Sequence, residues 1–216
     1  MKCNYRLYGG LVLLSLVITC VFLLLMPDTV PMHYDAAGVV DRFGSKYENL
    51  VFPAILAVVA VLFYALSKTK HVQPADGKVF FFTGLGMLIF FNILSLFFLW
   101  TALTYQPGDT RPMEPSGIVT LATGVLLAVL GNIMPKARRN SLFGLRTKWS
   151  LSSDAVWQKS QRFAGITGVA AGLLLILLAA VLNERWLLPV MLIILLAWGA
   201  ACAAASLIYY RQSPGK

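Results

Sequence analysis

The sequence predicts an all-α integral membrane protein, built as a bundle of six transmembrane helices. Three observations lead to this fold class. The 216 residues are 58% hydrophobic and only 12% charged, whereas soluble domains carry about 25% charged residues. The apolar runs reach about twenty residues, which a helix needs to cross a bilayer. The runs are also continuous and Leu-rich, which favours helices over a barrel of alternating strands.

Six spans are expected in order along the chain. Their approximate limits are 8–26, 50–67, 79–101, 116–134, 163–182 and 186–208. Pro27 ends the first span, and Pro53 lies in the first turn of the second, where its missing N–H is tolerated. The first span resembles a signal peptide, but no small-x-small cleavage site follows it. A retained first helix is therefore expected.

The charges predict the orientation of the bundle. Four of the eighteen Lys and Arg residues fall in the loops after the first, third and fifth spans. These four are Arg42, Lys46, Arg111 and Arg185. The other fourteen fall at the opposite face, and basic residues mark the cytoplasmic side, so both termini are expected in the cytoplasm. The net charge of +9 then reflects orientation and attraction to anionic lipid, not direct nucleic-acid binding.

The spans themselves carry few polar groups. No Asp, Glu, Lys, Arg or His lies in the middle of a span, where ion-coupled transporters place such residues. Asn92 is expected to form an interhelical hydrogen bond. Small residues repeat at four-residue spacing in two spans. They are Thr120, Gly124 and Ala128 in the fourth span and Gly168 and Gly172 in the fifth. Close packing within the bundle is preferred, and a homodimer seam is the alternative.

The outer loop at residues 27–49 holds one candidate site. His33, Asp35 and Asp41 offer an imidazole and two carboxylates, which suit a metal ion. Such a set is common by chance in exposed loops, so no metal is expected. Ser45 and His33 are not spaced as a nucleophile and its base, and catalysis is not expected either.

Structural roles account for most of this outer loop. Gly38 and Gly44 are expected in turns. Tyr34, Phe43 and Tyr47 are expected at the membrane interface as an aromatic belt. The three cysteines, at positions 3, 20 and 202, form no disulfide or zinc pattern.

The inner loop at residues 135–162 is the dominant cytoplasmic segment, and with Arg162 it holds seven of the basic residues. Pro135 ends the fourth span, and Asn140 and Gly144 are typical turn residues. Ser152 or Ser153 is expected to cap a helix that has Asp154 in its first turn.

That helix has one apolar face, formed by Val156, Trp157, Ser160 and Ala164, which Trp149 is expected to join. We expect an amphipathic helix that lies on the inner leaflet and leads into the fifth span. The alternative is a basic loop that only anchors the topology.

The inner loop resembles the signature of the SdpI family of bacterial multi-helix membrane proteins. The residues that carry this resemblance are Gly131, Asn132, Met134, Pro135, Lys136, Arg138, Asn140, Gly144, Leu145, Arg146, Thr147, Trp149, Ser150, Leu151, Ser153, Val156, Trp157 and Arg162. The family pattern usually reads Arg-Thr-Pro-Trp-Thr. Here Lys148 replaces the proline and Ser150 the second threonine, and Gln161 stands where the family often has His.

The outer loop adds a second resemblance. Pro31, His33, Gly38, Asp41 and Gly44-Ser45-Lys46 are similar to a small domain of unknown function that commonly precedes the SdpI module. Two modules are therefore expected. Residues 1–78 form a two-helix module with the outer loop 27–49, and residues 79–216 form a four-helix SdpI-like module with the inner loop 135–162.

The resemblance implies an immunity protein without enzymatic activity or cofactor. Such a protein protects its cell from a secreted peptide toxin, and it also acts as a receptor that holds an ArsR-like transcriptional repressor at the inner face. The acidic outer face, with seven acidic against four basic residues, would attract a cationic toxin. Candidate toxin contacts are His33, Tyr34, Asp35, Asp41 and Lys46. The alternatives are a housekeeping or envelope-stress protein without a toxin partner, and a small-molecule transporter.

Overall fold

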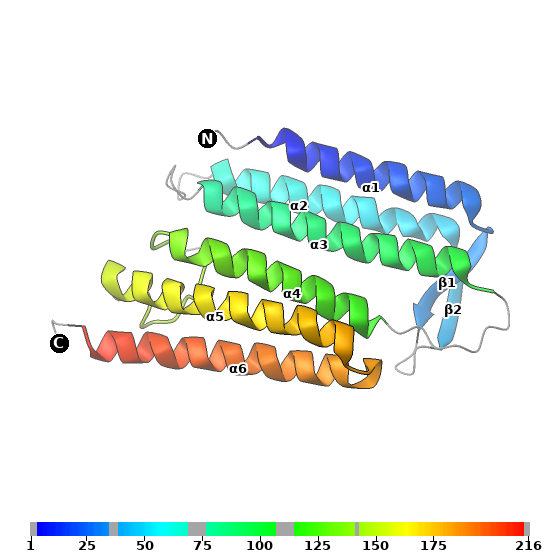
Figure 1. The fold of residues 1–216 in the computed structure, drawn as a ribbon. Coiled ribbons are helices and arrows are strands. Elements are labelled where there is room, and N and C mark those ends of the chain that lie inside the picture. The colour runs from blue at the N-terminus through cyan, green and yellow to red at the C-terminus, as the bar shows by residue number, and fades with distance from the viewer. Residues whose placement is uncertain (1–3, 35–38, 69–76, 107–114, 141–142, 214–216) are drawn as a thin grey trace.

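The computed structural model describes residues 4–34, 39–68, 77–106, 115–140 and 143–213. Within these residues it holds six helices that are long and apolar enough to cross a membrane, so the predicted fold class is confirmed. They are α1 (Arg6–Leu25), α2 (Val51–Lys68), α3 (Gly77–Thr104), α4 (Ser116–Ile133), α5 (Asp154–Val181) and α6 (Glu184–Arg211). The helices run side by side as a bundle (Figure 1).

The six helices pack as two groups of three. In the first group α1 contacts both α2 and α3, and in the second α5 contacts both α4 and α6. The packing of α3 on α4 joins the groups (Figure 1). Thus α3 packs on both α2 and α4, whereas the sequence-based division places it in a four-helix module. That division into modules stays a prediction.

Each group has its own apolar core. In the first, Tyr8, Leu56, Phe81 and Leu88 pack together. The buried Tyr8 hydroxyl donates to the carbonyl oxygen of Phe81 at 2.7 Å, which satisfies a polar group inside the bundle. In the second, the members are Leu127, Leu175 and Met191. Many other large apolar side chains point outward, as expected for a protein whose surroundings are lipid.

Asn92 differs from expectation. Its Nδ2 donates to the carbonyl oxygen of Leu88 at 2.9 Å, one turn earlier on the same helix. The predicted interhelical bond is therefore wrong. The backbone carbonyl within reach on α3 satisfies the amide without a partner from another helix.

The outer loop is better ordered than the sequence suggested. It folds as an antiparallel hairpin of β1 (Thr29–Tyr34) and β2 (Val40–Ser45), followed by the short helix η1 (Lys46–Leu50). Gly44 lies inside β2 with no positive φ, so its predicted role in a turn is wrong. A Cβ at Gly44 would collide with the Glu48 carboxylate, so close approach is why glycine stands there. Gly38 lies outside the described residues.

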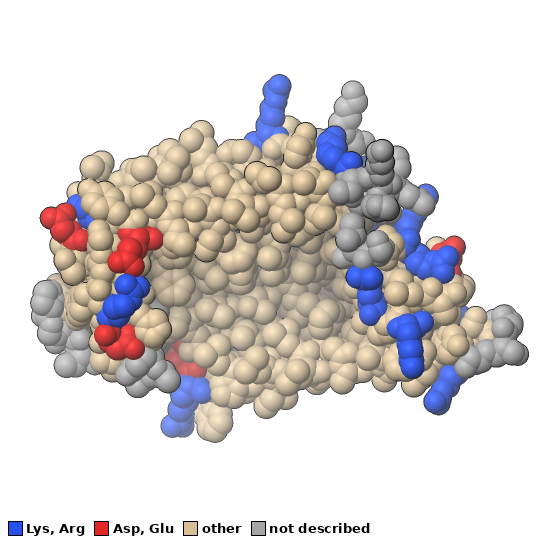
Figure 2. All heavy atoms as spheres, turned by 180° about the vertical axis from the view of Figure 1, so that it is seen from behind, with Lys and Arg blue, Asp and Glu red and all other residues tan. Residues whose placement is uncertain are grey.

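The hairpin and the two ends of the described chain lie at opposite ends of the bundle (Figure 1). On the face shown in Figure 2, most charged side chains gather toward these two ends, and a broad, largely uncharged surface lies between them. The end next to the chain termini is mainly basic, and the hairpin end carries most of the acidic residues seen (Figure 2). This distribution fits a chain that crosses a bilayer. Which end faces the cytoplasm stays a prediction.

Candidate functional site

The segment between α4 and α5, residues 134–153 where described, forms a folded cap on the end of the bundle. We call it the signature loop. It begins with the short helix η2 (Met134–Lys136), in which Pro135 follows the end of α4. Ser153 then caps α5 by accepting a hydrogen bond from the Val156 N–H at 3.2 Å, with Asp154 in the first turn. The predicted cap and first-turn acid are thus confirmed.

The predicted amphipathic helix is corrected by the structure. It is the first part of α5, a continuous helix of 28 residues that is about 42 Å long. Its face of Val156, Trp157, Ser160 and Ala164 is fully buried inside the protein instead of lying on a lipid leaflet. Trp149 does not join this face, because it lies in a turn before the helix begins.

Trp157 fastens the first half of the signature loop. Its indole is completely buried, and its Nε1–H donates to the carbonyl oxygen of Ala137 at 2.8 Å. A buried indole N–H without a partner would be costly. Asn140 adds a turn by accepting from the Phe143 N–H at 2.7 Å, as expected of a turn residue.

Gln161 fastens the second half. Its side-chain oxygen accepts from the Leu145 N–H at 3.0 Å, and its Nε2 donates to the Leu145 carbonyl oxygen at 2.9 Å. The side chain is fully buried. Gly144 beside it has a φ of +98°, and a Cβ there would lie 2.6 Å from Oε1 of Gln161. The predicted turn at Gly144 is confirmed, and both the left-handed backbone and the close approach require glycine.

The turn at residues 147–150 is closed by two side chains. The Thr147 N–H donates to Oγ of Ser150 at 2.9 Å, and the Ser150 N–H donates to Oγ1 of Thr147 at 3.0 Å. Thr147 also bonds to Ser206 of α6 at 2.9 Å between the hydroxyl oxygens. The loop is therefore tied to α5 and α6 as well as to itself.

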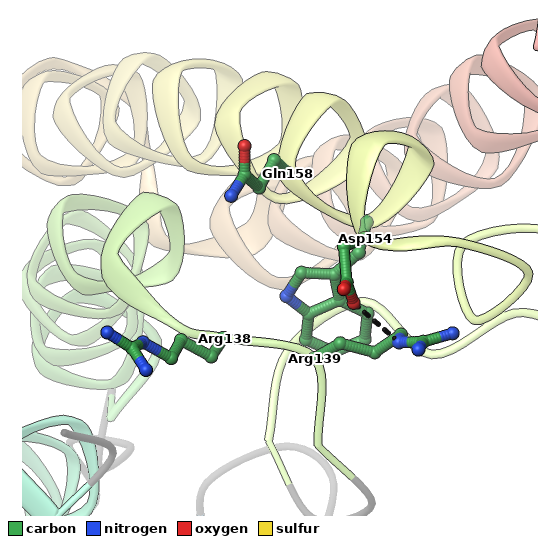
Figure 3. Close-up of a pocket in the computed structure, with 5 residues that line it drawn as sticks. Arg138, Arg139, Asp154 and Gln158 are labelled. Atoms are coloured by element: carbon green, nitrogen blue, oxygen red, sulfur yellow. Dashed lines mark ion pairs between the residues drawn. The ribbon is translucent and has the colours of Figure 1, made fainter.

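A polar cleft of about 360 Å³ opens on the outside of the signature loop. Arg138, Arg139, Asp154, Trp157 and Gln158 line it. Nε of Arg139 pairs with Oδ1 of Asp154 at 2.7 Å, while Arg138 extends in the opposite direction (Figure 3). Arg139 also donates to the carbonyl oxygen of Leu151 at 3.0 Å. The cleft thus offers guanidinium and amide groups suited to an acidic partner.

The remaining signature residues differ in exposure. Asn132, Lys136, Arg146 and Arg162 are exposed, so their side chains are available to other molecules. Trp149 is half-buried, with Nζ of Lys148 lying 5.5 Å from the centre of its ring.

The small-residue ladders of α4 and α5 pack against each other. A Cβ at Gly124 would lie 2.7 Å from the carbonyl oxygen of Gly172, and one at Gly172 would lie 2.7 Å from the N of Ala128. Close backbone contact of this kind needs residues without side chains. The preferred interpretation, packing within the bundle, is confirmed for this seam.

At the other end, the hairpin brings together two of the predicted outer residues. Nδ1 of His33 lies 2.6 Å from Oδ1 of Asp41, and both side chains are well exposed. Asp35 lies outside the described residues. Among those described, no three His, Cys, Asp or Glu side chains form a group fit to hold a metal ion.

Lys46 and Tyr34 are less accessible than His33. Nζ of Lys46 pairs with Oδ1 of Asp28 at 3.0 Å, and its side chain is only 15% exposed. Tyr34 is half-buried, and burial raises the pKa of its phenol, with a smaller contribution from Tyr105.

The sequence analysis missed the structural roles of two residues, Glu48 and Gln161. Glu48 completes a capping box with Ser45 and pairs with Arg42 at 3.1 Å. The spacing Ser-x-x-Glu is the signal that would have found it. Gln161 was noted only as a departure from a family pattern, and nothing in the sequence indicates its contact with Leu145.

Comparisons with known proteins agree with this architecture. Residues 136–209 match the SdpI/YfhL protein family, and residues 10–57 match a domain of unknown function, DUF1648. The chain is 27% identical over 179 residues to Immunity protein SdpI of Bacillus subtilis, covering 80% of this chain and 83% of that protein.

An uncharacterized protein of Archaeoglobus fulgidus is 38% identical over 45 residues, which are 21% of this chain and 25% of that protein. No solved structure matches the chain significantly. The predicted resemblance to the SdpI family, with the small domain before it, is thereby confirmed.

Proposed function

Since the chain carries a segment of the SdpI/YfhL protein family behind its small N-terminal domain, we propose that it is a membrane immunity protein of a bacterial cytoplasmic membrane. In this proposal it protects the cell from a secreted antimicrobial peptide without catalysing a reaction. The observation that carries the proposal is the similarity to Immunity protein SdpI, which extends over 80% of the chain. The six helices that are long and apolar enough to cross a membrane support this proposal, because a membrane-active peptide would act there.

The hairpin end is the proposed first contact for the peptide. Its exposed groups include His33 and Asp41, held together at 2.6 Å, and the Asp28 carboxylate, which is 93% exposed. An acidic, exposed end attracts a cationic peptide over several ångströms. The Lys46 side chain is only 15% exposed and pairs with Asp28, so its proposed role is to support the hairpin and not to contact the toxin.

The signature loop is the proposed output surface. Its buried bonds from Trp157 and Gln161 hold the loop in one conformation, while Arg138, Arg139 and Gln158 remain around the open cleft. A rigid loop that presents guanidinium groups suits an acidic surface of an ArsR-like repressor. Tagged repressor should move to the membrane fraction when toxin is added, and a repressor that stays soluble would remove this part of the proposal.

A transporter is less well supported. It would need a polar cavity at the middle of the membrane. The groove between α3 and α4, of about 200 Å³, is lined by apolar residues such as Phe90, Leu126 and Val129. The polar cleft lies at the end of the bundle.

Survival under toxin is the decisive test. The protein is expressed in a toxin-sensitive Bacillus strain, which is challenged with antimicrobial peptides from the source bacterium and its kin. Protection is expected to raise the lethal concentration severalfold, and the double variant His33→Ala, Asp41→Ala is expected to lose part of it.

Arg185→Gln serves as the matched control, because it removes an exposed charge predicted on the same side but outside the hairpin. Membrane levels are measured for every variant. Unchanged killing by every peptide, with the protein present in the membrane, would contradict the immunity role.

A further inference from the structure

A second, apolar groove of about 370 Å³ lies on the membrane side of the signature loop. Leu130 and Met134 of α4 line it together with Trp198 and Gly199 of α6. Leu145 and Arg146 of the loop line it as well. The groove therefore runs from the membrane-spanning part of the bundle to a cationic group at its end.

The packing of the helices leaves this groove open. Glycines draw α4 tightly onto α5, whereas α4 and α6 touch much less. Trp198 leans on α5, where its Nε1 donates to Oγ1 of Thr167 at 3.1 Å. At Gly199 a Cβ would meet no atom within 4 Å, so this position contributes empty space.

Arg146 places an unpaired positive charge beside the groove. It is exposed, and among the described residues it makes no ion pair or hydrogen bond. Its neighbours hold the backbone in place, since Leu145 bonds to Gln161 and Thr147 bonds to Ser206. An unpaired guanidinium on this held stretch of backbone is suited to bind a phosphate.

We propose that this groove binds one anionic phospholipid, with an acyl chain between α4 and α6 and the phosphate at Arg146. The apolar lining suits a hydrocarbon chain, and the charge at the end of the spans matches the level of lipid headgroups. Bulk lipid tails are as apolar as the groove, so discrimination between lipids must come from the headgroup. The proposal does not depend on the immunity role.

Quenching of tryptophan fluorescence tests the site. Full-length protein is placed in nanodiscs of phosphatidylcholine that contain a rising fraction of chain-brominated phosphatidylglycerol. For wild type and for each variant, the contribution of Trp198 is the fluorescence of that protein minus the fluorescence of the same protein carrying Trp198→Phe. This contribution is expected to be quenched in a saturable manner. Brominated phosphatidylcholine is expected to need about a five-fold higher fraction, as one cationic contact predicts.

Two variants separate the headgroup from the chain. Arg146→Gln should abolish the difference between the two lipids, and Lys159→Gln, which removes an exposed charge away from the groove, should keep it. Gly199→Leu should abolish the saturable quenching, and Gly10→Leu, at an equally open position on α1, should not. Melting temperatures show which variants fold.

Equal quenching by both lipids in the wild type would overturn the proposal, and so would saturable quenching that survives a folded Gly199→Leu variant. If that variant does not fold, the loss or retention of lipid discrimination in Arg146→Gln decides. If neither lipid quenches the Trp198 fluorescence, the proposal is also overturned. That result would point to another occupant of the groove, such as an apolar peptide.

Discussion

Gly131 of α4 and Gly165 of α5 face each other backbone to backbone. A Cβ on Gly131 would lie 2.7 Å from the carbonyl oxygen of Gly165, and one on Gly165 would lie 2.6 Å from that of Gly131. Gly131 lies in the last turn of α4, just before the signature loop, and Gly165 lies in α5 beyond the buried residues Trp157 and Gln161. This contact therefore holds together the two helices that the signature loop connects.

Adding one methyl group at this contact should destabilise the protein. Gly131→Ala and Gly165→Ala each force the two helices apart, and overpacking of this kind costs about 1–3 kcal/mol. The melting temperature in detergent should fall for both. Gly10→Ala, where a Cβ meets nothing within 4 Å, is the control and should not lower it. Equal melting of Gly131→Ala and wild type would contradict the close seam.

Gln161 provides a second test of the loop. Gln161→Leu keeps the volume but removes the bonds to the N–H and carbonyl of Leu145. The carbonyl keeps its bond from Oγ of Ser150 at 2.8 Å, but the N–H loses its partner, and an unsatisfied buried group costs about 1–3 kcal/mol. The variant should melt earlier, and proteolysis should cut within the loop. Gln158→Leu changes an exposed glutamine one turn away and should do neither. If the two variants behave alike, Gln161 does not hold the loop.

The spans were predictable because lipid imposes a long, continuous apolar run that no other context requires. The start of α5 at Ser153 was predictable as well, but the burial of its first part was not, because Asp154, Lys159 and Arg162 make that stretch polar in sequence. The apolar face of Trp157 was recognised, but the sequence does not say whether lipid or protein covers it. Here the signature loop covers it.

The outer hairpin was missed for a different reason. Its strands are six residues long, and their alternation is broken by the irregular pairing between Pro31 and Tyr34. The pairing of His33 with Asp41 depends on that register, which composition and spacing do not determine.

A substitution at Arg139 should affect the proposed recruitment of the repressor without affecting stability. Its ion pair with Asp154 is largely exposed, and exposed pairs contribute about 0–1 kcal/mol. Arg139→Gln should therefore melt within a few degrees of wild type. If the cleft is the output surface, the same variant should reduce recruitment of the repressor while toxin protection is kept. Arg211→Gln, at an exposed position on α6, is the control for lost charge. A marked fall in melting temperature would instead assign Arg139 a structural role.

The raised pKa of Tyr34 leads us to expect that stability at the hairpin end depends on pH. Because burial raises its pKa above the usual value of about 10, the folded state favours the neutral phenol. This contribution to stability is complete below pH 10 and is lost as the pH rises through the higher folded-state pKa. An absorbance titration of tyrosinate should show a late component that Tyr34→Phe removes. Tyr105→Phe should move it to lower pH. Identical titrations of wild type and Tyr34→Phe would contradict the shift.

Orientation decides whether the hairpin can meet a toxin at all. With the native cysteines replaced, a single cysteine at Asp28, whose side chain is 93% exposed, should react in intact cells with a membrane-impermeant maleimide. A single cysteine at Lys159, exposed at the other end, should react only after the cells are opened. This outcome follows from fourteen basic residues on the signature-loop side against four on the hairpin side. The reverse labelling would place the hairpin in the cytoplasm, where a secreted peptide could not reach it first.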